Sequence, residues 1–107
     1  MASLKNFSHL STYSASKAAS YSLTQGLRSE LGAKGVSILS VHPGPVDTDM
    51  GEAAGFDNGA STSVISEGIV SALKAGDFHL FPDEMAKQVE SAYQSFSDNI
   101  VLADLPE

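Results

Sequence analysis

Tyr13-Ser14-Ala15-Ser16-Lys17 is the stretch from which both the fold and the chemistry of this chain can be argued. If these residues form a helix, a tyrosine and a lysine four positions apart lie on the same face, one turn above the other. A nearby ammonium favours the ionised form of a phenol, which could then exchange a proton with a substrate oxygen near neutral pH. A solvated surface pair is the alternative that this stretch leaves open when it is taken alone.

A second motif, Val41-His42-Pro43-Gly44-Pro45-Val46-Asp47-Thr48-Asp49-Met50, follows an apolar run and opens a loop. Pro43 fixes its own backbone angle and would end a strand, and Gly44 permits a ligand to approach the backbone closely. The carboxyl end of a parallel strand is the place where open α/β sheets bind cofactors. An ordinary Pro-Gly turn is the alternative interpretation of the same residues.

Hydrophobic periodicity predicts three helices, from about Tyr13 to Leu31, from Ser63 to Ala75, and onward from a cap at Asp83. Short apolar runs predict strands at Val36–Val41 and Phe78–Phe81. The order helix, strand, helix, strand, helix predicts an α/β fold in which the strands are parallel and the crossover is right-handed. The first strand is expected to be buried on both faces.

Two of these helices carry apolar stripes that are expected to lie in the core or in a subunit interface. The first stripe consists of Ala15, Ala19, Leu23, Leu27 and Leu31, and the second of Met85, Val89, Ala92, Tyr93 and Phe96.

The composition excludes several classes of function. The chain has 107 residues, a net charge of −7 and only six basic residues, which form no cluster, so nucleic acid is not an expected partner. No apolar run is long enough to span a membrane, and the first residues lack the apolar core of a signal peptide. Together with the absence of cysteine, this predicts a cytoplasmic protein.

No metal site is expected either. His9, His42 and His79 are not at metal-ligand spacing, and a lone histidine at a strand end, such as His42, is more often structural than catalytic. Asp47 and Asp49 could form a carboxylate pair or a magnesium site, but a solvated loop face is the favoured interpretation.

A helix with Tyr-x-x-x-Lys, then a strand, then Pro-Gly-x-Val-x-Thr-x-Met, resembles the C-terminal half of a short-chain dehydrogenase/reductase, from about Leu4 to about Ala103. The resemblance implies a Rossmann-like three-layer fold. It also implies an NAD(P)-dependent oxidoreductase, which transfers a hydride between NAD or NADP and a small carbonyl or alcohol substrate. A homo-dimer or homo-tetramer is implied as the assembly.

The resemblance also implies roles for individual residues. Tyr13 would be the general acid/base, and Lys17 would tune Tyr13 and hold the nicotinamide ribose. The implied cofactor-binding residues are Tyr13, Lys17, Pro43, Gly44, Val46 and Thr48.

The chain departs from the family pattern in what it lacks. It contains no Gly-x-x-x-Gly-x-Gly turn for a pyrophosphate, and the position of the family's catalytic serine falls before Met1. We therefore expect residues 1–107 to be the C-terminal catalytic half of a dinucleotide-binding domain whose Gly-rich N-terminal half is absent, and to be inactive alone. The alternative is a non-catalytic, truncated member of the family that acts as an oligomerisation or interaction module.

Overall fold

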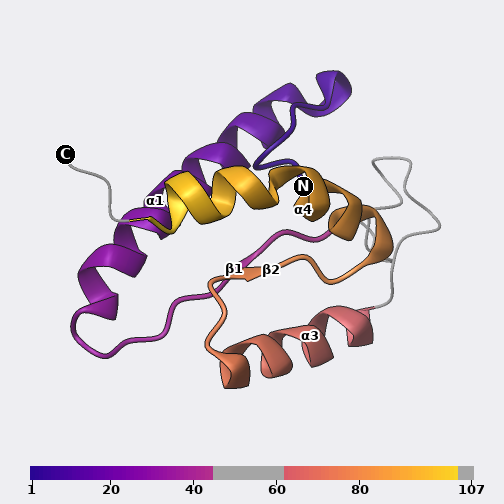
Figure 1. Ribbon diagram of the computed structural model, residues 1–107. Coiled ribbons are helices and arrows are strands. Elements are labelled where there is room, and N and C mark those ends of the chain that lie inside the picture. The colour runs from indigo at the N-terminus through magenta and orange to yellow at the C-terminus, as the bar shows by residue number, and fades with distance from the viewer. Residues whose placement is uncertain (45–61, 104–107) are drawn as a thin grey trace.

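Two short parallel strands lie between the helices in the computed structural model, which describes residues 1–44 and 62–103 (Figure 1). The elements are a 3-10 turn at Ser8–Leu10, α1 at Ser11–Gly32, β1 at Ser40–Val41, α3 at Thr62–Ala75, β2 at His79–Leu80, α4 at Glu84–Phe96 and a π-helical turn at Ser97–Val101. The predicted bounds of α1 and α3 are correct to within two residues. The observed order of helices and parallel strands agrees with the α/β fold that the resemblance to short-chain dehydrogenases implies.

The strands pair in the predicted parallel sense. Ser40 lies opposite His79 and Val41 opposite Leu80. The amide of Ser40 donates to the Phe78 carbonyl at 2.7 Å, and the amide of His42 donates to the Leu80 carbonyl at 2.8 Å.

Both strands are shorter than predicted. Only two residues of each apolar run, 36–41 and 78–81, take part in pairing. No third strand joins the sheet within residues 1–44 and 62–103, and the expected burial of the first run on both faces is wrong for this part of the chain. Ser40 is buried, whereas Val36 at the start of the run is 47% exposed.

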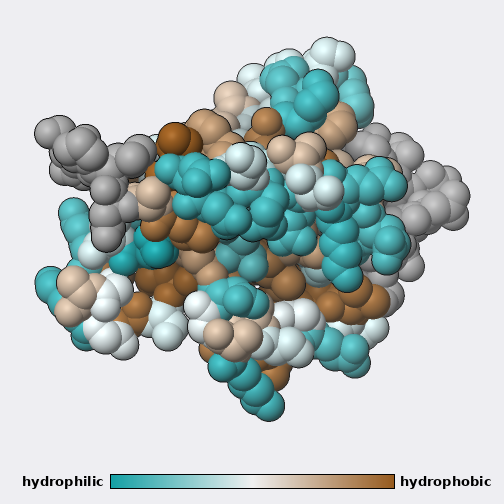
Figure 2. All heavy atoms as spheres, viewed as in Figure 1, coloured by the Kyte–Doolittle hydropathy of each residue, from teal (hydrophilic) through white to brown (hydrophobic). Residues whose placement is uncertain are grey.

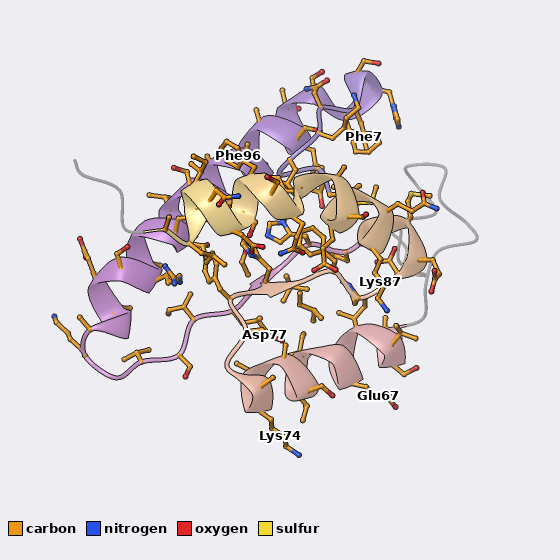
Figure 3. The ribbon with its side chains drawn as sticks, in the orientation of Figure 1. Phe7, Glu67, Lys74, Asp77, Lys87 and Phe96 are labelled. Atoms are coloured by element: carbon orange, nitrogen blue, oxygen red, sulfur yellow. The ribbon has the colours of Figure 1, made fainter. Side chains whose placement is uncertain are left out.

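The helices lie on both sides of the sheet. Figure 1 shows α1 and α4 on one side and α3 on the other. The Tyr21 hydroxyl of α1 lies 3.0 Å from the Tyr93 hydroxyl of α4, which ties these two helices together. On the other side, a Cβ at Gly68 of α3 would come within 3.3 Å of Leu80, so glycine permits α3 to pack closely on β2. Glu67 and Lys74 lie on the outer side of α3 (Figure 3).

The core is small, and the helical stripes predict it in part: Val89 and Tyr93 of the α4 stripe pack against it, whereas Met85 and Phe96 do not lie in it. Its buried centre consists of Met1, Phe81 and Ala86, with Leu4, Phe7, Val89 and Tyr93 packed around it. In α4 the fully buried residue is Ala86, while Met85 and Phe96 are about half exposed. Figure 2 shows the outer side of α4 as largely hydrophilic, with apolar residues gathered below it toward α3.

The stripe on α1 is largely exposed in the described residues, so of its two expected locations the core is wrong and a subunit interface stays a prediction. Leu23 is 71% exposed and Leu27 is 46% exposed. The residues of α1 that are buried are Ser14 and Tyr21. The reason is that the neighbouring face of α1 makes polar and aromatic contacts with histidines that come from distant parts of the sequence, and periodicity does not reveal such contacts.

Asp83 caps α4, as predicted from the sequence. One carboxylate oxygen accepts a hydrogen bond from the Ala86 amide at 3.2 Å, and the other accepts one from the Gly44 amide at 2.8 Å. A single buried side chain therefore stabilises the start of α4 and holds the backbone just after β1.

Candidate active site

Tyr13 and Lys17 lie side by side on the first turns of α1. The Lys17 ammonium is 5.4 Å from the centroid of the Tyr13 ring. Tyr13 is 38% exposed, and Lys17 is exposed as well. The spacing of four residues does bring the phenol and the ammonium together, as the sequence predicts, and it leaves both accessible to a small molecule.

Tyr21 continues the same face of the helix four residues further on, and it packs against the sheet. Its ring meets His42 edge to face, with 4.6 Å between centroids, and its hydroxyl lies 2.6 Å from Nε2 of His79. Since Tyr13 and Lys17 precede Tyr21 on this face, they lie further toward the N-terminal end of α1 than the contact with His42.

The charge of Lys17 acts on the amino group that binds the backbone just after β1. The Met1 amino group donates a hydrogen bond to the Pro43 carbonyl at 3.2 Å. Burial lowers the pKa of this amino group to about 6; Asp83 opposes the lowering, and the positive charge of Lys17 adds to it. The Met1 amino group is therefore hydrogen-bonded to the Pro43 carbonyl, and the charge of the Lys17 ammonium contributes to its lowered pKa.

His42 has a structural role, which confirms the sequence interpretation. It is 2% exposed, its Nδ1 lies 2.7 Å from the Ser3 hydroxyl and its Nε2 lies 2.8 Å from the Ser40 hydroxyl. Its ring stacks on Phe81 with 5.0 Å between centroids. Burial lowers the pKa of His42 to about 4, so the imidazole is neutral at physiological pH.

The structure gives a reason for glycine at position 44 that the sequence did not reveal. A Cβ at this position would collide with the Asp83 carboxylate, which accepts the Gly44 amide. The glycine is thus required for the contact between the end of β1 and the cap of α4, apart from any contact with a ligand.

Two of the predicted cofactor-binding residues, Val46 and Thr48, lie outside the described residues, as do Asp47 and Asp49. Of the predicted set, the structure places Tyr13, Lys17, Pro43 and Gly44.

Sequence reasoning missed a cluster of polar groups around His79. The Tyr21 hydroxyl contacts both His79 and the Tyr93 hydroxyl, and Nδ1 of His79 lies 3.3 Å from the Ser97 hydroxyl. Burial raises the pKa of Tyr21 and lowers that of His79, so both groups are neutral. The cluster borders a pocket of about 220 Å³ between β2 and α4. Its members are up to 76 positions apart in the sequence, from Tyr21 to Ser97, so no local pattern could have revealed it.

Within residues 1–44 and 62–103, no three His, Asp or Glu side chains gather in a way that could hold a metal ion. None of the helices in the same residues combines the length and the hydropathy that crossing a membrane requires.

Comparison with known proteins identifies the family. The model of the short chain dehydrogenase family matches residues 1–58, which is more than half of the chain and includes both sequence motifs. The chain belongs to this family. No solved structure matches the chain significantly.

Several curated relatives are named as oxidoreductases. An uncharacterised oxidoreductase of Staphylococcus saprophyticus is 58% identical over 38 residues, which cover 36% of this chain and 16% of the relative. One of Staphylococcus epidermidis is 42% identical over 59 residues, covering 52% and 26%. The probable oxidoreductase EphD of Mycobacterium bovis is 41% identical over 56 residues, covering 52% and 10%. The chain thus matches about a quarter or less of the length of each of these relatives.

The neutral state of His42 makes stability depend on pH. Its pKa is about 4 in the folded chain against 6.5 ordinarily, so below pH 6.5 the unfolded state binds more protons and stability falls as the pH falls toward 4. Between about pH 7 and about pH 5, His42 should remove about 2 kcal/mol from the free energy of unfolding. Urea unfolding at the two pH values measures this loss.

The matched variant is His42→Gln, which cannot titrate. Its unfolding free energy should be lower at pH 7 but should change by about 2 kcal/mol less between the two pH values. An equal pH dependence in the two proteins would show that His42 is not neutral in the folded chain.

Proposed function

We propose that this chain is the C-terminal catalytic portion of an NAD(P)-dependent short-chain dehydrogenase/reductase that acts on a small carbonyl or alcohol substrate. The observation that carries the proposal is the position of the Tyr13 phenol beside the Lys17 ammonium, with both side chains exposed on the first turns of α1. Membership of the family and the oxidoreductase names of the relatives support the same activity.

The residues present fit the nicotinamide end of the cofactor. Tyr13 and Lys17 offer a hydroxyl and an ammonium to a polar ring substituent or a ribose. Pro43 and Gly44 follow β1, and the carboxyl end of a parallel strand is where open α/β sheets bind cofactors. A bound NAD or NADP would supply or accept the hydride. The chain itself contains no Gly-rich turn that could hold the pyrophosphate, so that contact would have to come from residues outside these 107.

The proton chemistry belongs to Tyr13 and Lys17. In the direction of reduction, the Tyr13 hydroxyl donates its proton to the substrate oxygen as that oxygen gains negative charge. In the direction of oxidation, the Tyr13 oxygen accepts the proton from the substrate hydroxyl. The Lys17 ammonium stabilises the negative charge that the phenol oxygen carries once the proton has left.

The test uses a chimera, because the chain matches only part of each relative. The segment of the Staphylococcus epidermidis oxidoreductase that corresponds to residues 1–58 is replaced by these residues, and a panel of aldehydes, ketones and alcohols is assayed with both nicotinamide cofactors. Tyr13→Phe should lower kcat by a factor of about 10² to 10⁴ without lowering Tm, because it removes only the proton-transferring hydroxyl.

Lys34→Met is the matched control for charge, since Lys34 is an exposed lysine just beyond α1 and should be silent. Lys17→Met should lower kcat and raise the KM for the cofactor. Normal turnover by Tyr13→Phe would refute the assignment, and so would a chimera without activity on any substrate that the unmodified relative converts.

A second candidate is an interaction module that keeps the assembly surface of the family without its catalysis. The observation that favours it is the exposure of Leu23 and Leu27 on α1, since exposed leucines along one helix face are typical of an interface. In this case the chain associates with itself through α1.

Light scattering at high micromolar concentration tests this candidate. The chain should be a dimer or larger, and Leu23→Glu should shift it toward monomer because it places a charge in the apolar contact. Val70→Glu on α3 is the matched control, at a residue that is 52% exposed, and should leave the assembly unchanged. A monomeric parent chain would exclude the interaction module.

A further inference from the structure

The orientation of Tyr13 and Lys17 is not set by burial of their own side chains, because both are exposed. Their side chains follow wherever the first turns of α1 lie. What holds these turns therefore decides where the phenol and the ammonium are presented.

The start of α1 lacks the usual means of fixation. Leu10 occupies the N-cap position, and no side chain caps the helix there. The Ser11 hydroxyl does bond to Ser8 and Asn6, but these contacts are exposed and compete with water. Such contacts contribute little net stability.

Ser14 makes the contact that is protected from water. Its side chain is 3% exposed, and its hydroxyl accepts a hydrogen bond from the Phe7 amide at 3.3 Å. Ser14 directly follows Tyr13, so its side chain points about 100° further around the helix axis. Ser14, which is next to the exposed Tyr13, is thus hydrogen-bonded to the segment that precedes the helix.

That segment is fixed in turn by the core. Phe7 packs against the cluster of Met1, Phe81 and Ala86. Figure 3 shows Phe7 beside the first turns of α1. A continuous path of contacts therefore runs from the core through Phe7 and Ser14 to the turn that carries Tyr13.

We propose that Ser14 is a positioning residue for Tyr13 and Lys17. By accepting the Phe7 amide, it fixes the first two turns of α1 against the segment that packs on the core, and with them the place at which the Tyr13 phenol and the Lys17 ammonium are presented. The consequence for catalysis rests on the function proposed above. A displacement of about 1 Å in a reacting group can lower a rate by as much as 10²-fold, so the loss of this contact matters for a proton donor.

The first experiment measures the contact directly and needs no activity. The Phe7 amide donates to the Ser14 hydroxyl, so its hydrogen should exchange with deuterium more slowly, in the NMR spectrum of the 107-residue chain, than that of an amide bonded only to water. Ser14→Ala should speed this exchange about tenfold and should shift the amide signals of residues 11–17, with amide signals outside residues 7–17 unchanged. Ser20→Ala, at an exposed serine of the same helix, is the matched control and should leave the Phe7 exchange rate unchanged.

An unchanged exchange rate of the Phe7 amide in a folded Ser14→Ala chain would overturn the proposal, and so would an equal change in Ser20→Ala. If Ser14→Ala does not fold, Ser14→Cys takes its place, because a thiol has nearly the same shape and is a weaker acceptor. The same faster exchange of the Phe7 amide is then expected, and its absence would be equally decisive.

The second experiment uses the chimera. Ser14→Ala should lower kcat about tenfold while KM stays within about twofold, since the variant misplaces the phenol without removing a substrate contact. Tyr13→Phe separates the two proposals. If Ser14→Ala speeds the exchange of the Phe7 amide but Tyr13→Phe remains active, the placement of α1 by Ser14 stands and the catalytic role of Tyr13 falls. If Tyr13→Phe is inactive and Ser14→Ala is fully active, the reverse holds.

Discussion

Tyr21 anchors α1 on the sheet through its buried ring, which contacts both His42 and His79. The ring meets His42 edge to face and the hydroxyl meets His79 at 2.6 Å, so one side chain joins the helix to the ends of both strands. Tyr13 and Lys17 lie on the same side of α1, two turns and one turn before Tyr21. The direction in which the exposed pair is presented therefore follows in part from where Tyr21 is anchored.

The contact of Tyr21 with the two histidines depends on both imidazoles being neutral. Burial lowers the pKa of both His42 and His79, and each imidazole then has one nitrogen that donates and one that accepts. His42 uses its two nitrogens on Ser3 and Ser40, which leaves its ring free to pack between Tyr21 and Phe81. A charged imidazole would have to be desolvated in the same place, which is why acid conditions should loosen the contact.

Much of this fold follows from local sequence patterns. The ends of α1 and α3 and the Asp83 cap are local features with local signals, such as Gly76 with its positive φ of 77° after α3. The parallel pairing joins residues 39 positions apart, and it follows from the alternation of helices and strands along the chain. The buried faces do not follow in the same way. The leucine stripe of α1 is exposed while Ser14 and Tyr21 are buried, because burial is decided by partners that lie far away in the sequence.

The candidate site shows the same division. The spacing of Tyr13 and Lys17 predicts their proximity, since one helical turn is enough to determine it. By contrast, the need for glycine at Gly44 comes from Asp83, which is 39 positions away, and the fixation of Tyr13 comes through the core around Phe7. Sequence alone therefore indicates the pair that is proposed to carry the chemistry, whereas the structure shows which distant residues surround and hold the elements that bear it.

Tyr13 and Lys17 are proposed to act as one proton-handling unit. A double-mutant cycle on kcat/KM measures whether the two residues do so. The chimera is compared with Tyr13→Phe, Lys17→Met and the double variant. Groups that act as a unit give strongly non-additive effects, so the double variant should lose about as much as Tyr13→Phe alone. If the fold-loss of kcat/KM in the double variant equals the product of the fold-losses in the two single variants, the residues act independently and do not form one proton-handling unit.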